Sequence, residues 1–216
     1  MKHSLNSEEK NRLDRRIAEA EKRTGAQIVL AVIERSDSYS ELPWKAFALG
    51  TSLAGLLVLA MNILLPLNSA TKAVLLSIVM MLAAGAGLAL LCVFNPDFAR
   101  LFLPDHRSDV ETKQYAKSLF LERELFATGK RRAVLIMISL FERRIVVLPD
   151  KGLASQLHKE TADEIVQHMR MTLRSGQLAL ALEGGLQKLE ELIAGDATST
   201  PSGNELTNAL IEEKGA

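Results

Sequence analysis

The 216-residue chain has one cysteine, one tryptophan and no net charge, because its 26 basic side chains are balanced by 26 acidic ones. A single cysteine excludes an internal disulfide and any zinc site that is built from several cysteines. Without a basic excess, nucleic-acid binding has no electrostatic support. The length allows one or two domains, and a hydrophobic content of 48% is too high for a disordered chain.

Charge is also missing from two long stretches of the chain. Residues 46–65 and 73–94 contain no acidic or basic side chain, and most of their residues are apolar. A bilayer core needs about 20 helical residues to span it. Core helices of a soluble protein, the alternative, usually carry a polar stripe. The pattern therefore predicts a transmembrane helical hairpin whose link, residues 66–72, contains the turn residues Pro66 and Asn68.

The distribution of lysine and arginine predicts how the hairpin is oriented. Nine of these residues precede the first span, one lies in the link and sixteen follow the second span. Positive residues accumulate on the cytoplasmic side of a membrane. We therefore expect an inner or cytoplasmic membrane protein with both termini in the cytoplasm.

The predicted spans contain little that is polar. Their one ionisable group is the thiol of Cys92, which argues against a transport path, because such paths need buried acids, bases or waters. Asn62 is more typical of a hydrogen bond between helices. Small residues recur at a spacing of four, at Gly50 with Ala54 and at Ala83 with Gly87. That spacing lets helices approach closely, either within the hairpin or in a homo-oligomer. The expected partners are the lipid bilayer and a membrane protein.

The remaining residues predict helices and strands of an α/β domain. Apolar residues at helical spacing indicate helices at 7–24, 110–128, 159–174 and 177–194, and continuous apolar runs indicate strands at 28–33, 133–138 and 144–148. A lone apolar strand needs a sheet, so we expect one domain that the hairpin interrupts. The expected parts are residues 1–45 and 95–194 of the domain, the hairpin at 46–94, and a flexible tail at 195–216.

The order of these elements places the polar residues on opposite edges of the sheet. The helix predicted at 110–128 forms a crossover between the first two strands, so these strands should be parallel. The hairpin enters the chain within this crossover. The carboxyl ends of the two strands should then face the membrane. Arg143 and Arg144 would lie at this edge, where they can meet anionic lipid or simply be solvated. Residues 130–132 (KRR) and Asp150 would lie at the other edge.

Three stretches resemble the TPM domain family: residues 17–30 (IAEAEKRTGAQIVL), 126–136 (FATGKRRAVLI) and 142–152 (ERRIVVLPDKG). The resemblance covers about residues 5–42 and 112–194, on either side of the hairpin. It implies a small α/β/α sandwich with a mixed sheet, often tethered to a membrane. Some members of the family are phosphatases, and others are accessory factors of membrane complexes.

The sequence contains no strong motif for catalysis or metal binding. It has no Gly-rich phosphate loop, no HExxH pair and no Cys-x5-Arg motif outside the membrane spans. The weak candidates for a metal site are Asp150, Asp105 and Asp109, because carboxylates bind hard cations. More ordinary roles are an Asx-type turn at Asp150 and a helix N-cap at Asp109. The other acidic or histidine side chains near the spans are Asp37, Glu41, Asp97, His106 and Glu111.

These observations favour a non-catalytic adaptor or quality-control factor of a membrane complex. The sequence does not identify catalytic residues. No cofactor is expected beyond a possible divalent cation. The alternative is a weak, metal-assisted phosphatase, which would use an acidic edge of the domain.

Overall fold

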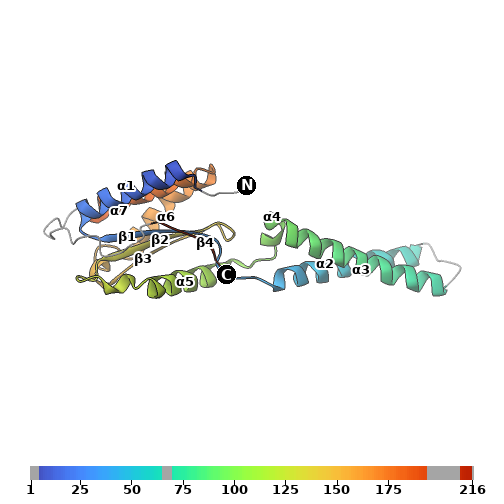
Figure 1. Cartoon of the computed structure of the whole chain (residues 1–216). Coiled ribbons are helices and arrows are strands. Elements are labelled where there is room, and N and C mark those ends of the chain that lie inside the picture. Colours follow the sequence, from blue (N-terminus) through green and yellow to red (C-terminus); the bar gives the residue numbers. More distant parts are fainter. Residues whose placement is uncertain (1–4, 65–69, 194–209, 216) are drawn as a thin grey trace. The chain divides into compact units, whose positions relative to one another are not determined.

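The computed structural model describes residues 5–64, 70–193 and 210–215 (Figure 1). The chain forms two compact units. One combines Met1–Asp37 with Asp109–Ala216, and the other is Ser38–Ser108. We call them the α/β unit and the helical unit. The first therefore contains segments from both ends of the sequence.

The α/β unit begins with helix α1 (Ser7–Thr24), as the sequence predicts. Asn6 and Glu9 form a capping box: the Asn6 side chain accepts from the Glu9 amide at 2.7 Å, and the Glu9 carboxylate accepts from the Asn6 amide at 2.8 Å. Gly25 ends the helix with φ 61°, a left-handed conformation that glycine adopts without strain. Leu13 and Ile17 are fully buried, so the apolar stripe of α1 faces the core.

The sheet has four strands in the order β3-β2-β1-β4. Strands β1 (Gln27–Arg35) and β2 (Ala133–Ser139) are parallel, and β3 (Arg144–Pro149) pairs antiparallel with β2. All seven residues of β2 are buried, as expected for a strand that is covered on both faces. The three predicted strands and their directions are confirmed.

The fourth strand corrects the sequence analysis. Leu210–Gly215, which belong to the predicted flexible tail, form strand β4 and pair in parallel with β1, with Leu30 opposite Leu210. Residues 194–209 and 216 lie outside the described residues. The strand is short and rich in charge, so its own sequence carries almost no strand signal. Its place depends on the edge of β1, which the sequence does not reveal.

Helices cover both faces of the sheet, which makes the unit an α/β/α sandwich (Figure 1). Helices α1, α6 (Lys159–Arg174) and α7 (Leu178–Ile193) pack on one face, and α5 (Asp105–Glu122) packs on the other. Alternate residues of β1 divide between the two faces. Ile28 and Leu30 belong to the first core cluster, and Val29 and Ala31 belong to the second. The predicted fold class is confirmed.

Helix α5 differs from the predicted helix at 110–128. It begins at Asp105 and ends at Glu122, and a short 3-10 helix, η1 (Leu125–Ala127), follows it. Asp109 therefore lies inside the helix and is not its N-cap. The start follows Pro104, whose carbonyl accepts from the Ser108 amide at 3.0 Å. The apolar spacing fails to mark this start because the first turns of α5 are mostly polar.

The helical unit contains two long apolar helices, α2 (Glu41–Leu64) and α3 (Ala70–Phe94), which are followed by the short helix α4 (Pro96–Arg100). Both α2 and α3 are long and apolar enough to cross a membrane. They pack on one another through glycine. A Cβ atom on Gly50 would lie 2.7 Å from the Ala84 carbonyl oxygen, and one on Gly85 would lie 2.9 Å from the Phe47 ring.

The structure thus separates the small residues of the hairpin into two groups. Gly50 and Gly85 are buried where α2 meets α3. Ala83 and Gly87 are exposed, and a Cβ atom on Gly87 would have no neighbour within 4 Å. Only the first group serves contact within the hairpin.

Candidate functional site

Two clusters of polar side chains lie at opposite ends of the strands in the α/β unit. At one end, β1 finishes at Arg35, β2 finishes at Ser139 and β3 begins at Arg144. The turn between β2 and β3 is attached to the end of β1 by two backbone bonds. The Leu140 amide donates to the Ile33 carbonyl at 3.0 Å, and the Phe141 amide donates to the Glu34 carbonyl at 2.8 Å.

Glu142 is the centre of this end of the sheet, and its carboxylate is buried, with 8% of the residue exposed. One oxygen accepts from the Ser36 amide at 2.8 Å and from the Ser36 hydroxyl at 2.6 Å, and the other accepts from the Ser139 hydroxyl. Three donors therefore compensate for the burial of one carboxylate. The carboxylate joins the segment after β1 to the segment after β2.

A serine hydroxyl that donates to a carboxylate can act as an activated nucleophile when a substrate can reach it. Ser36 is 6% exposed and Ser139 is completely buried. A substrate cannot reach either hydroxyl, and both oxygens of Glu142 already accept hydrogen bonds. The cluster therefore has the properties of a structural lock.

Two arginines lie at the same end of the sheet, as predicted. Arg143 has φ 53°, in the left-handed region that non-glycine residues rarely adopt. Arg144 lies 3.9 Å from a carboxylate oxygen of Asp109 on α5. Arg35 stacks over the Phe141 ring at 5.9 Å. The antiparallel register, with Ser139 opposite Arg144 and Val134 opposite Pro149, places residues 130–132 at the other end.

Asp150 occupies that other end, where Arg131 holds it. The Arg131 Nε and Nη2 atoms donate to the two carboxylate oxygens, both at 2.7 Å, and the Lys151 amide donates to Asp150 at 2.7 Å. The hydrogen bond from Arg131 is the largest cause that lowers the pKa of Asp150 from its ordinary value of 3.8. Asp150 also caps the short helix η2 (Lys151–Leu153), which matches the turn role considered from the sequence.

Gly152 completes this arrangement because the chain passes very close to it. A Cβ atom at Gly152 would lie 2.6 Å from the carbonyl oxygens of both Lys130 and Arg131. The Gly152 amide donates to the Arg131 carbonyl at 2.9 Å. The backbone therefore helps to hold Arg131 against Asp150, and the carboxylate is engaged by a fixed guanidinium.

The other predicted acidic candidates are divided between the two units. Glu41, Asp97, Asp105 and His106 belong to the helical unit, whereas Asp37, Asp109 and Glu111 belong to the α/β unit. Several carboxylates pair with cations: Glu41 with Arg107 at 2.9 Å, Asp109 with Lys113 at 2.7 Å, and Asp97 with Arg100. Within residues 5–64, 70–193 and 210–215, no three His, Cys, Asp or Glu side chains gather as a metal site would require.

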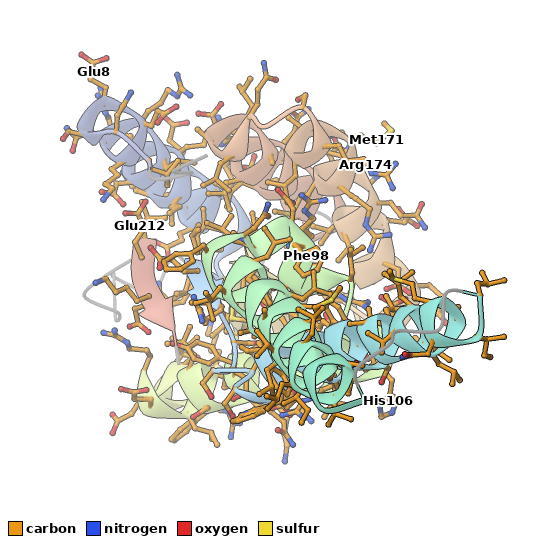
Figure 2. All side chains as sticks on the ribbon, turned by 90° about the vertical axis from the view of Figure 1, so that its right-hand side faces the viewer. Glu8, Phe98, His106, Met171, Arg174 and Glu212 are labelled. Atoms are coloured by element: carbon orange, nitrogen blue, oxygen red, sulfur yellow. The ribbon has the colours of Figure 1, made fainter. Side chains whose placement is uncertain are left out.

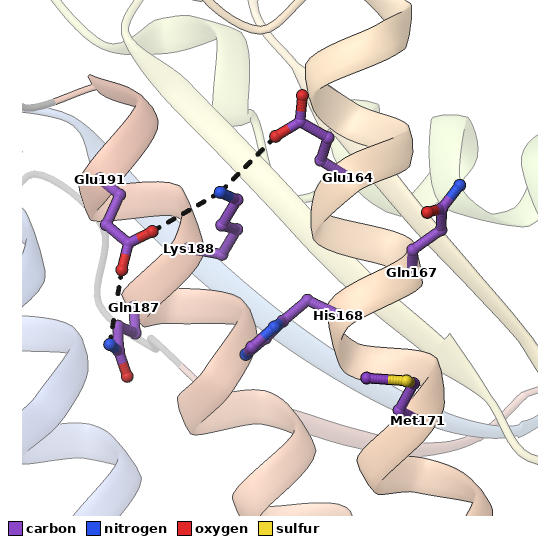
Figure 3. A pocket seen from close by; sticks show the side chains of 7 residues that line it. All are labelled: Glu164, Gln167, His168, Met171, Gln187, Lys188 and Glu191. Atoms are coloured by element: carbon purple, nitrogen blue, oxygen red, sulfur yellow. Dashed lines mark hydrogen bonds and ion pairs between the residues drawn. The ribbon is translucent and has the colours of Figure 1, made fainter.

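A polar groove of about 410 Å³ lies between α6 and α7 (Figure 3). Its volume falls within the range of ligand sites. Its cation, Lys188, lies 3.5 Å from Glu164 and 3.6 Å from Glu191, and the Gln187 amide donates to Glu191 at 3.4 Å. The ring of His168 lies against Gly184. The lysine of the groove is therefore engaged by two carboxylates, and one negative charge is left in excess.

Sequence reasoning missed the lock formed by Ser36, Ser139 and Glu142, and it missed the Arg131 partner of Asp150. A glutamate in a four-residue turn after a fully apolar strand is a weak signal for a buried carboxylate. The two serines are 103 residues apart in the chain, at positions 36 and 139. Only the parallel pairing of β1 with β2 brings them together.

Comparisons with known proteins agree with this architecture. A search of curated proteins finds no match. The NMR structure of the BA42 protein from the psychrophilic bacterium Bizionia argentinensis is similar, with a TM-score of 0.55 over 98% of this chain and 97% of that one. The identity is 14%, so the similarity concerns the fold. The TPM domain family model matches residues 67–192, from the hairpin link through almost all of α7. Since this match spans more than half of the chain, the protein belongs to the TPM domain family.

Proposed function

We propose that this protein is a membrane-anchored TPM domain that acts, without catalysis, as an adaptor or quality-control factor for a membrane complex. The observation that carries the proposal is the exposure of the two long helices. Only 11% of the most apolar 18-residue window of α2 and 6% of that of α3 is buried. A core helix of a soluble protein would be mostly buried, so lipid is the environment that fits these surfaces.

The exposed apolar side chains cover much of the hairpin surface. In Figure 2 side chains project outward from the hairpin helices. Leu56, Ile63 and Val79 are among the residues with more than half of their surface exposed. Soluble proteins rarely expose apolar patches larger than a few hundred Å². We place the hairpin in the inner or cytoplasmic membrane with both termini in the cytoplasm, following the lysine and arginine distribution.

The hydrogen bonds that the two buried carboxylates accept support an accessory role. Glu142 and Asp150 are both saturated by donors of the protein itself. A phosphatase needs an accessible nucleophile or a metal-held water, with positive groups for the phosphoryl oxygens. Among the described residues, these two buried carboxylates strengthen the fold instead.

The outward face of α3 is the surface that we propose for a partner helix or a second copy. Ala83 and Gly87 are exposed there, and small residues let a neighbouring helix approach closely. A photo-crosslinking amino acid at position 83 or 87 should then yield a reproducible protein adduct in intact membranes. The same group at Met81, whose sulfur would lie 3.8 Å from a Cβ atom on Gly55 of α2, is the matched control and should yield no adduct with another protein. Lipid adducts alone at both positions would contradict the proposal.

A metal-assisted phosphatase is the second candidate, because the matching family model carries "phosphatase" in its name. The test is hydrolysis of a phosphomonoester by the full-length protein in detergent, with magnesium or with a chelator. The accessory role predicts equal background in both conditions and no change in Asp150→Asn. Magnesium-dependent turnover that the chelator and Asp150→Asn abolish would establish the phosphatase instead.

A further inference from the structure

The base of the hairpin, where α2 begins and α3 ends, carries three large apolar side chains that are mostly exposed. Trp44 is 72% exposed, Phe94 is 79% exposed and Leu101 is 77% exposed. We call these three residues the collar. Trp44 lies on the first turn of α2, Phe94 ends α3, and Leu101 follows α4.

The collar is held on a fixed framework. Lys45, next to Trp44, donates from Nζ to the Phe102 carbonyl, next to Leu101, at 3.4 Å. This contact brings two collar residues that are far apart in the chain to the same end of the unit. The rings of Phe98 and Phe102 stack edge to face at 5.4 Å. Asn95 caps α4 by accepting from the Asp97 and Phe98 amides, so α4 is a defined helical turn after α3.

The position of Trp44 along α2 corresponds to one boundary of a bilayer. At about 1.5 Å per residue, the uncharged residues 46–64 of α2 extend about 28 Å. This length is close to the hydrocarbon core of a typical bilayer, about 30 Å. Trp44 then falls just outside the hydrocarbon, at the depth where tryptophan and tyrosine are enriched in membrane proteins.

The charges around the collar are balanced locally. Arg107 pairs with Glu41 at 2.9 Å and stacks over the Tyr39 ring at 5.8 Å. Arg100 pairs with Asp97. A surface that recognises anionic lipid carries clusters of uncompensated lysine and arginine. The collar instead consists of aromatic and aliphatic side chains and has ion pairs beside it, which suits the interface of a bilayer whatever the charge of its headgroups.

We propose that the collar lies in the headgroup interface of the phospholipid bilayer and fixes the depth of the hairpin, independently of lipid charge. This inference rests on the proposed membrane anchoring. It adds to that proposal the residues that set the depth and the class of lipid surface that they contact.

Trp44 reports on its own position, because it is the one tryptophan of the chain. The full-length protein is reconstituted into phosphatidylcholine vesicles whose acyl chains carry bromine either near the headgroup or near the chain end. Trp44 fluorescence should be quenched more by the shallow bromines than by the deep ones. The same ranking should hold when a third of the lipid is phosphatidylglycerol. Stronger quenching by the deep bromines, no quenching, or quenching only with phosphatidylglycerol would overturn the inference.

Two tryptophan transfers test the collar as a surface. Trp44→Phe combined with Leu101→Trp should reproduce the shallow quenching. Trp44→Phe combined with Met171→Trp is the matched control. Met171 is 74% exposed on α6 of the α/β unit, at the labelled position in Figure 2. Its tryptophan should respond to aqueous acrylamide and not to brominated lipid, and equal lipid quenching of both variants would overturn the inference.

Flotation of the vesicles after alkaline washing separates failure of this inference from failure of the anchoring. Protein that floats while Trp44 is deep or water-exposed contradicts the collar and leaves the anchoring intact. Protein that does not float contradicts both.

Discussion

Glu142 shows how one residue can determine the connection between distant segments. Its carboxylate is buried, and burying a charged group without hydrogen bonds costs free energy. The amide and hydroxyl of Ser36 and the hydroxyl of Ser139 supply those hydrogen bonds. The same three donors connect the ends of β1 and β2. A glutamate in a predicted turn is usually exposed to solvent, whereas Glu142 is buried and connects two strands.

Replacing Glu142 with alanine should lower the free energy of unfolding of the α/β unit by about 1–3 kcal/mol, because buried donors lose their acceptor. Glu142→Gln should cost less, since its carbonyl oxygen still accepts and the serine hydroxyls can rotate. Urea unfolding in detergent, followed by pulse proteolysis, measures both. Equal stability of Glu142→Ala and the wild type would show that the cluster does not hold the strands together.

Asp150→Asn should destabilise the unit by about 1 kcal/mol at neutral pH, because the bidentate pair with Arg131 is lost and the exposure of Arg131 to water screens that pair. The pKa of Asp150 in the folded state lies below its ordinary value of 3.8. The stabilisation is therefore complete above pH 3.8 and disappears as the pH falls through the folded pKa. The difference between wild type and variant, measured by urea unfolding across pH, should shrink in acid. A difference that does not change with pH would rule out the ion pair as its source.

Among the helices and strands, the sequence predicts those that the residue pattern of their own segment marks. The apolar spacing marks α1, and the continuous apolar runs mark β1, β2 and β3. The pattern fails at the start of α5, where polar residues hide the helix, and at β4, which exists through pairing with a distant strand. What could be predicted is local, and what was missed depends on contacts between segments.

Strand β4 should contribute to the stability of the whole sheet. Ile211 is buried against the core that α5 covers, and Glu213 accepts from Tyr115 at 3.0 Å and from Arg123 at 2.6 Å. Ile211→Ala should cost about 2–4 kcal/mol and speed amide exchange in β1. The control Glu212→Gln alters an ion pair with Lys10 whose lysine is 41% exposed, and it should cost less than about 1 kcal/mol. Unchanged exchange in Ile211→Ala would mean that β4 is not docked in solution.

The two groups of small residues in the hairpin should respond differently when a glycine in each is replaced by a larger residue. Gly50→Leu places atoms into the backbone of α3, because even a Cβ atom would lie 2.7 Å from the Ala84 carbonyl oxygen. This variant should lower the thermal stability of the protein in detergent. Gly87→Leu, on the open face, should leave that stability unchanged while it weakens crosslinking through Ala83. The reverse order of the two effects would contradict the helix packing described above.

At the scale of the whole molecule, the neutral composition conceals an uneven arrangement. The charged residues lie in the α/β unit and at the ends of the hairpin, and residues 46–65 and 73–94 have none. The sequence alone predicts this division, because the absence of charge over a long stretch is a local property. The candidate site was less predictable. The order of the predicted strands is enough to assign Asp150 and Arg143 to opposite ends of the sheet, whereas the Ser36–Glu142–Ser139 lock depends on the parallel register of β1 and β2.

Membrane anchoring by the hairpin is the property on which the other proposals depend. Membranes containing the full-length protein are washed with alkaline carbonate and floated on a density gradient, beside a variant with Leu56, Ile63 and Val79 all replaced by lysine. We expect the wild type to float with the lipid. We expect the variant not to float, because a lysine at the centre of a helix resists insertion by about 2.5–3.5 kcal/mol. Recovery of the wild-type protein as a soluble species in the carbonate supernatant would contradict membrane anchoring by the hairpin.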